Sequence, residues 1–137
     1  MHEWALAKSI VDTVLEVAKE RSVKSVEEVI IVVGEISQID LDILRLALKE
    51  LSKGTIAERA SFILREEEAV FKCNSCDKTW SFREVKNKLV SELGEDNPIH
   101  FVPDLVYALV RCPYCGSPDF ELLRGRGVWI ESIRGVK

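Results

Sequence analysis

The sequence predicts an α+β fold, an α/β two-layer arrangement of two helices on a small three-stranded sheet that is interrupted by a second, inserted domain. Three observations predict it: two amphipathic helical patterns in the first half, short apolar segments rich in β-branched residues, and four cysteines in two C-x-x-C pairs. We therefore expect an α/β domain formed by residues 1–70 and 120–137 and a zinc-ribbon domain formed by residues 71–119.

The first predicted helix begins almost at the N-terminus. Apolar residues recur at helical spacing from Leu6 to Ala18, and charged or hydroxyl residues fill the other face. Residues 29–33 (Val-Ile-Ile-Val-Val) are β-branched and apolar on both faces, so they predict a central strand. Gly34 is expected to mark the bend where this strand ends.

The second helix is predicted to start after Asp40, an N-cap residue. Its apolar face runs from Leu41 to Leu51, Gly54 is placed to terminate it, and we expect it to lie on the same sheet as the first helix. A strand is predicted from Phe62 through Val70 to the first cysteine pair. Alternating residues 128–133 predict the last strand, so the inserted domain falls between the second and third strands.

The cysteines predict a metal site. All four occur in two pairs with two residues between the partners: Cys73 with Cys76, and Cys112 with Cys115. This spacing lets both thiolates of a pair turn onto one ion, and Pro113 and Gly116 favour a turn in the second pair. Two matched pairs with no spare cysteine favour a structural zinc site with four cysteine ligands over two disulfides or a redox-active pair.

The segment between the two pairs is longer than expected for a simple ribbon. Residues 77–111 separate them, whereas the common spacing is roughly 15 to 20 residues. Helical spacing predicts one short helix from Phe82 to Leu93 and another from Leu105 to Leu109. The module is too small to bury much apolar surface, so zinc is expected to supply much of its stability.

Composition narrows the function classes. Nineteen basic and 23 acidic residues give a net charge of −4, which offers no general attraction to nucleic acid. No apolar run approaches the roughly 20 residues of a membrane span, and the start lacks the cationic region of a signal peptide, so we expect a cytoplasmic protein. The alternative from another class is a zinc-ribbon module that binds nucleic acid or proteins. The basic contacts to nucleic acid would be Arg124, Arg126, Arg134 and Lys137. A thiol oxidoreductase would need an exposed, reactive thiolate that zinc ligation would tie down.

The N-terminal residues Met1, His2 and Glu3 offer a second metal site. A terminal amine, a backbone amide and an imidazole lie within one chelate, and such nitrogen donors suit square-planar nickel(II) or copper(II). Taken alone, a histidine at position 2 is more often an ordinary solvated residue than a metal ligand.

The start Met1-His2-Glu3-x-Ala5-Leu6-Ala7, the segment Val33-Gly34-Glu35-Ile36, the two cysteine pairs and a closing apolar strand after Gly125 resemble the HypA family of hydrogenase and urease nickel-insertion proteins, in an archaeal-type form with an extended zinc domain. The resemblance implies a nickel metallochaperone that binds Ni(II) at its N-terminus and delivers it to the large-subunit precursor of a [NiFe] hydrogenase. It also implies work with the nucleotide-hydrolysing partner HypB, and a carrier that is not an enzyme. Urease is a second client in some members.

The resemblance assigns roles to particular residues. His2 matches the nickel-binding histidine and Glu3 the acidic residue beside it, while the four cysteines match the zinc ligands. The insertion departs from the shorter ribbons of the family and contains the only other histidine, His100. Because Met1 and His2 together supply three nitrogen donors, our hypothesis is that His100 completes the nickel plane as a fourth; the alternative is a surface or packing role.

Overall fold

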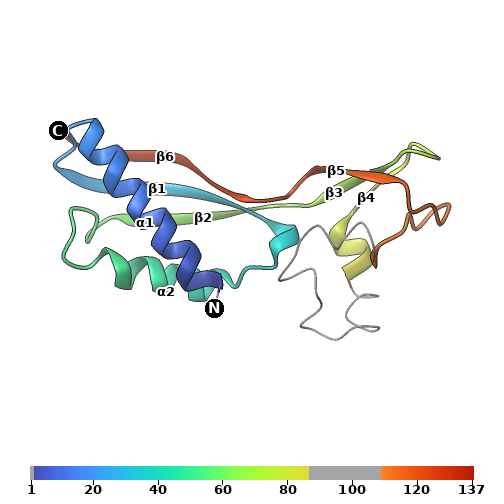
Figure 1. Ribbon diagram of the computed structural model, residues 1–137, viewed down its shortest axis with the longest axis horizontal. Helices are drawn as coiled ribbons and strands as arrows, with labels where there is room; N and C mark the ends of the chain where they lie inside the picture. The colour runs from blue at the N-terminus through green and yellow to red at the C-terminus, as the bar shows by residue number, and fades with distance from the viewer. Residues whose placement is uncertain (1, 87–108) are drawn as a thin grey trace. The chain divides into compact units, whose positions relative to one another are not determined.

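The structure is a computed structural model and describes residues 2–86 and 109–137. The chain forms two compact units (Figure 1). The first contains Met1–Val32, Ile39–Arg65 and Val128–Lys137, and the second contains Val33–Gln38 and Glu66–Gly127. The predicted domain boundaries at residues 70 and 120 remain a prediction, since compactness alone does not define a folding domain.

The first unit holds the predicted two-layer core. Its elements are α1 (His2–Glu20), β1 (Ser25–Gly34), α2 (Leu41–Ser52), β2 (Ser61–Glu67) and β6 (Val128–Val136). The sheet order is β2-β1-β6, so the segment predicted as the central strand does lie at the centre. The two helices pack against each other in this unit (Figure 1). The predicted fold class is therefore confirmed.

The helices bury the stripes that their sequences predict. Asp40 caps α2 because its carboxylate accepts hydrogen bonds from the backbone N–H groups of Asp42 and Ile43, at 3.0 and 3.1 Å. The helix ends at Ser52, and Gly54 follows with φ 77°, a conformation that favours glycine. The fully buried core side chains of α1, β1 and α2 include Ala7, Val14, Val29, Ile31, Val32, Leu44, Ala47 and Leu48. No helix within residues 2–86 and 109–137 is long and apolar enough to span a membrane.

The strand predicted from Phe62 to Val70 is wrong in one respect, because it is two strands. β2 ends at Glu67, and β3 (Val70–Cys73) belongs to a different sheet. The break falls at Ala69, which is fully buried and donates its backbone N–H to Oε1 of Glu35 at 3.0 Å. At Ala69 the backbone N–H thus bonds to a side chain of another segment and not to a neighbouring strand. The pattern of apolar and polar residues around Ala69 does not predict this partner.

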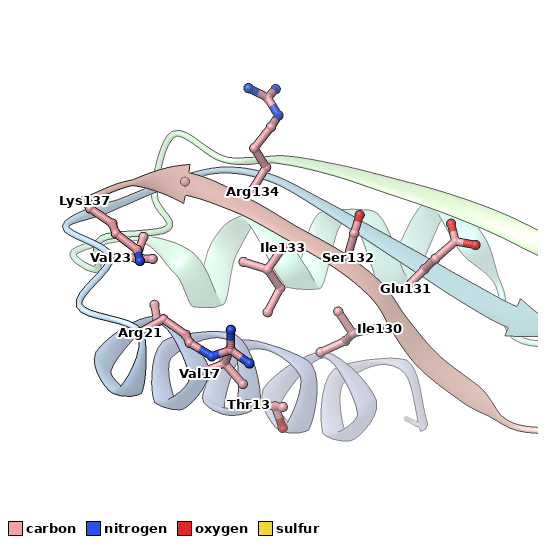
Figure 2. A pocket seen from close by; sticks show the side chains of 12 residues that line it. Thr13, Val17, Arg21, Val23, Ile130, Glu131, Ser132, Ile133, Arg134 and Lys137 are labelled. Atoms are coloured by element: carbon pink, nitrogen blue, oxygen red, sulfur yellow. The ribbon is translucent and has the colours of Figure 1, made fainter.

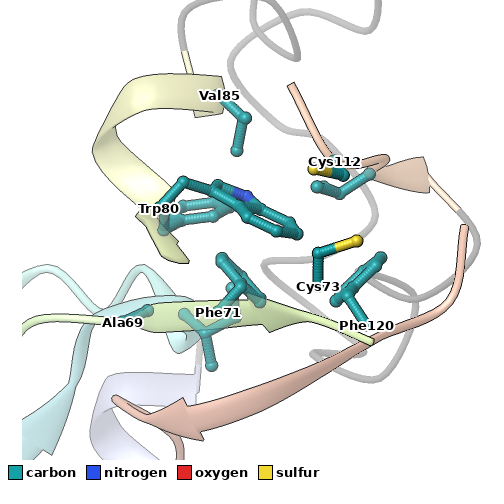
Figure 3. Packing of buried hydrophobic residues seen from close by; sticks show 10 residues of the cluster. Ala69, Phe71, Cys73, Trp80, Val85, Cys112 and Phe120 are labelled. Atoms are coloured by element: carbon teal, nitrogen blue, oxygen red, sulfur yellow. The ribbon is translucent and has the colours of Figure 1, made fainter. Parts of the chain in front are cut away.

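The second unit is a small antiparallel sheet with order β4-β3-β5, where β4 is Thr79–Ser81 and β5 is Phe120–Arg124. Its core is aromatic (Figure 3). The ring centroid of Phe71 lies 5.5 Å from that of Trp80 in a stacked arrangement and 5.4 Å from that of Phe120 edge to face. Residues 82–86 are helical and so is Leu109, the last residue of the second predicted helix, while the rest of the two helices predicted in the insertion lies outside the described residues.

Three chain segments of the second unit cross where there is no room for side chains. A Cβ on Gly34 would lie 2.4 Å from the carbonyl oxygen of Gly125, and a Cβ on Gly125 would lie 2.2 Å from Cα of Ala69. Backbone hydrogen bonds join the crossing segments, from Gly34 N–H to the Gly127 oxygen and from Ile36 N–H to the Gly125 oxygen, at 2.7 and 3.1 Å. Gly34 thus permits a close approach of backbones as well as ending β1.

Candidate metal centres

The first cysteine pair lies on a tight loop after β3. The backbone N–H of Cys73 donates to the carbonyl of Lys78 at 2.9 Å, and the N–H of Asp77 donates back to the carbonyl of Cys73 at 3.0 Å. The N–H groups of Ser75 and Cys76 both point at Sγ of Cys73, each at 3.4 Å. Amide donors aimed at a sulfur stabilise its thiolate form, the form that binds metal.

The second pair repeats this loop. The N–H of Cys112 donates to the carbonyl of Ser117 at 3.0 Å, and the N–H of Gly116 returns to the carbonyl of Cys112 at 2.9 Å. Tyr114 N–H points at Sγ of Cys112 at 3.4 Å. Gly116 has φ 75°, so the turn predicted at this glycine is present. Two loops of the same construction thus present two thiols each.

The four sulfurs come together. All lie within 4.8 Å of one another, with 3.6 Å between Sγ of Cys73 and Cys115 and 3.7 Å between Sγ of Cys76 and Cys112. Zinc–sulfur bonds of about 2.3 Å in a regular tetrahedron would separate the sulfurs by about 3.8 Å. A disulfide would need about 2.05 Å, so the geometry fits four ligands of one ion and not two bonded pairs.

The cluster is buried on one side only. Cys73 and Cys112 are buried beside the Trp80 and Phe120 rings, whereas Cys76 is half-buried and Cys115 is exposed (Figure 3). Next to the exposed side, Nζ of Lys78 lies 4.7 Å from the centre of the Tyr114 ring. The core therefore buries two of the four candidate ligands, Cys76 packs against its edge, and only Cys115 is exposed.

The electrostatics of the four thiols favour binding of a cation. Burial raises the pKa of Cys73, but the N–H groups of Cys76 and Ser75 and the neighbouring thiols outweigh burial and lower the pKa to about 7. At Cys115 the backbone N–H of Ser117 lowers the pKa, yet the Cys73 side chain and burial outweigh that donor and raise the pKa to about 12. Four close thiols cannot all lose their protons unless a cation offsets the repulsion between the thiolates.

The other candidate site is at the start of α1. His2 is the first residue of the helix, and Glu3 is 5% exposed. Oε1 of Glu3 accepts a hydrogen bond from the backbone N–H of Asp40 at 3.3 Å, which joins the beginning of α1 to the N-cap of α2. Burial raises the pKa of Glu3, but the backbone N–H groups of Glu3 and Asp40 contribute more and lower the pKa below its ordinary value of 4.5. Glu3 therefore carries its negative charge beside His2.

The structure brings some predicted site residues together and is silent on others. The four cysteines meet, and His2 and Glu3 occupy the first turn of α1. Met1 and His100 lie outside the described residues, so the predicted nickel plane stays a prediction.

Sequence reasoning missed the role of Glu35, which lies in the short helix η1 (Glu35–Ser37). This carboxylate is buried, and besides its bond with Ala69 its Oε2 lies 3.8 Å from Arg83. Its signals in the sequence were its place directly after an apolar strand and its place in the segment Val33-Gly34-Glu35-Ile36, and neither predicts its partner.

A four-thiol candidate metal centre in one unit and an α/β unit whose first helix begins with His2 are the features of a metal-binding protein. The chain belongs to the HypA family, because the family model described as "Hydrogenase/urease nickel incorporation, metallochaperone, hypA" matches residues 1–135. The resemblance seen in the sequence is therefore confirmed.

Two relatives agree along almost their whole length. The hydrogenase maturation factor HypA of Pyrococcus furiosus is 50% identical over 133 residues, which are 97% of this chain and 94% of the relative. The protein of the same name from Pyrococcus horikoshii is 51% identical over 134 residues, 98% of this chain and 95% of the relative. Both relatives are named as hydrogenase maturation factors, which is the class that the family assignment indicates for this chain.

Solved structures of the family share the fold. The solution structure of the Ni metallochaperone HypA from Helicobacter pylori superposes with a TM-score of 0.58 at 17% identity, covering 98% of this chain and 97% of that one. A second solution structure of a HypA protein gives a TM-score of 0.61 at 18% identity, covering 99% and 97%. At such low identity these likenesses support the fold alone.

Proposed function

We propose that this chain carries Ni(II) at its N-terminus for maturation of a [NiFe] hydrogenase and holds one Zn(II) permanently at Cys73, Cys76, Cys112 and Cys115. The observation that carries the zinc assignment is the arrangement of the four sulfurs, at separations close to a zinc–thiolate tetrahedron. Soft thiolate donors and a closed four-ligand set suit zinc and leave no position for substrate. The zinc is thus structural, and the chain acts as a carrier and not as an enzyme.

The nickel proposal rests on the first turn of α1. The amine of Met1, the amide of His2 and the imidazole of His2 are the nitrogen donors, and His100 is the proposed fourth. Glu3 contributes charge: its carboxylate is ionised and held against Asp40 N–H, so it favours a cation at this end of α1 without having to bind it directly. This differs from a role for Glu3 as a ligand, which remains the alternative.

The partners follow from the carrier role. We propose that this chain binds two partners, the nucleotide-hydrolysing protein HypB and the large-subunit precursor of the hydrogenase. Because copper(II) outcompetes nickel(II) at nitrogen sites, selectivity for nickel has to come from the supply of the metal and from recognition between these proteins. The names of the Pyrococcus relatives support hydrogenase as the client. Urease remains the second client class.

The test is a nickel titration of zinc-loaded protein with a native, untagged Met1. We expect one zinc per chain that resists dialysis, and one nickel with square-planar absorption that His2→Ala abolishes while the zinc content is unchanged. Glu3→Gln should weaken nickel binding without changing the absorption spectrum if Glu3 acts by charge, and should change the spectrum if it is a ligand. Zinc alone, with no specific nickel, would instead support a ribbon-type interaction module.

A further inference from the structure

A groove in the first unit is used by neither metal site. It runs between the second half of α1 and β6 (Figure 2) and has a volume of about 670 Å³. Its apolar lining comes from Val17 and Ala18 on the helix and from Ile130 and Ile133 on the strand. In the part of the chain that the structure describes, β6 is an edge strand in the order β2-β1-β6, so no further strand of this sheet covers that side. The groove is of a size that binding sites commonly have.

The side-chain charges around the groove are not balanced within residues 2–86 and 109–137. Among the described residues Arg21 and Lys137 have no carboxylate side chain as a partner, and Figure 2 shows that one follows α1 and the other follows β6. The remaining charged residues of the lining are neutralised: Glu131 pairs with Arg65 at 2.7 Å, and Arg134 pairs with Glu27 at 2.7 Å. The side chains at the rim are thus positive, although the chain carries a net charge of −4.

We propose that this groove docks a protein partner through a short segment that has two or three apolar side chains followed by acidic ones. The apolar residues would cover the lining between α1 and β6, and the acidic residues would meet Arg21 and Lys137. Two cations on an acidic chain are too few for a nucleic-acid backbone or a membrane surface, which need larger basic clusters. The docking proposal rests on the proposed function in one respect, which is that a carrier needs a partner protein. Nickel is not needed for the docking itself.

The test is selection of peptides without nickel. A displayed library of random 12-residue peptides is panned on the full-length zinc-loaded chain, and the enriched peptides are measured by fluorescence anisotropy. We expect sequences that combine apolar residues with Asp or Glu, whose affinity falls about tenfold or more for the Arg21→Glu/Lys137→Glu double variant. Replacing the acidic residues of the peptide by lysine should restore binding to that variant.

The matched control is Lys19→Glu/Lys24→Glu, which makes the same change in net charge at exposed residues that do not line the groove. Binding should be unchanged in this control. Equal losses in both double variants, enrichment of neutral or basic peptides, or no enrichment would overturn the proposal. Concentration-dependent dimerisation that only the Arg21→Glu/Lys137→Glu variant loses would overturn it in favour of a second copy of the chain. None of these outcomes depends on the nickel titration, so the two proposals fail separately.

Discussion

Replacing Gly125 by alanine should destabilise the cysteine-bearing unit much more than the same replacement at Gly127. Both glycines have positive φ, 95° and 83°, so each alanine costs about 1–2 kcal/mol for a left-handed backbone. At Gly127 the added Cβ meets nothing within 4 Å. At Gly125 it lies 2.2 Å from Cα and 2.5 Å from N of Ala69, and backbone atoms cannot rotate away as a side chain can.

The contacts around Gly125 give the size of the additional loss of unfolding free energy in Gly125→Ala. Overpacking a tight site costs typically about 1–3 kcal/mol. Moving Ala69 also stretches its N–H bond to the buried carboxylate of Glu35, and a buried acceptor that loses its donor costs about 1–3 kcal/mol. The total is about 3–8 kcal/mol for Gly125→Ala against about 1–2 kcal/mol for Gly127→Ala, a large fraction of the roughly 5–15 kcal/mol of an ordinary domain.

The assay is urea unfolding of both variants at fixed excess zinc, since metal binding adds to the apparent stability. Hydrogen exchange of the Ile36 amide, which is bonded to the Gly125 oxygen, gives a local measure. We expect faster exchange at Ile36 in Gly125→Ala than in Gly127→Ala. If the two variants lose the same stability, the close crossing of backbones at Gly125 and Ala69 is incorrect.

Three further predictions concern the helix cap, acid and metal. Asp40→Ala should lower the unfolding free energy by about 1 kcal/mol, because the N–H groups of Asp42 and Ile43 lose their acceptor; an unchanged thermal midpoint would contradict this. The lowered pKa of Glu3 means that its ionised form stabilises the fold fully above about pH 4.5 and that this contribution is lost as pH falls through the folded value. The stability difference between wild type and Glu3→Gln should therefore shrink below about pH 4.5, and a growing difference would refute the assignment. A chelator that removes the metal should expose Trp80, now 2% exposed, and shift tryptophan emission to the red while α1 stays helical; unchanged emission would argue against a metal-dependent core.

Patterns of neighbouring residues predicted those parts of the fold that depend on interactions between residues close in the sequence. The stripe from Leu6 to Ala18 sets α1, the carboxylate of Asp40 sets the start of α2, and the β-branched run at 29–33 sets the central strand. The cysteine loops were equally predictable, because two thiolates separated by two residues and a glycine at 116 specify a turn within a few residues.

The rest depends on contacts between distant segments. The break at Ala69 exists because Glu35, 34 residues earlier, accepts its N–H and because Gly125 crosses next to it. The charged residues Glu66, Glu67 and Glu68 interrupt the alternation before Ala69, but they do not show that the strands on either side join different sheets, so only the tertiary structure separates β2 from β3. Glu35 was missed for the same reason: its function is to accept the Ala69 N–H in a buried site, and that donor cannot be identified from neighbouring residues.

The two candidate metal sites differ in what would have to move for an ion to leave. At the cysteines, release requires protons to return to four thiolates, two of which are buried with Phe71, Trp80 and Phe120, so the metal leaves only if that core opens. At the start of α1, an ion held as proposed would leave when the nitrogen donors of the first turn let go, and the helix would stay folded because residues beyond that turn hold it in the core. A carrier that keeps one metal and passes on another would need such a difference, and the burial of Cys73 and Cys112 in the aromatic core is what would retain the first metal.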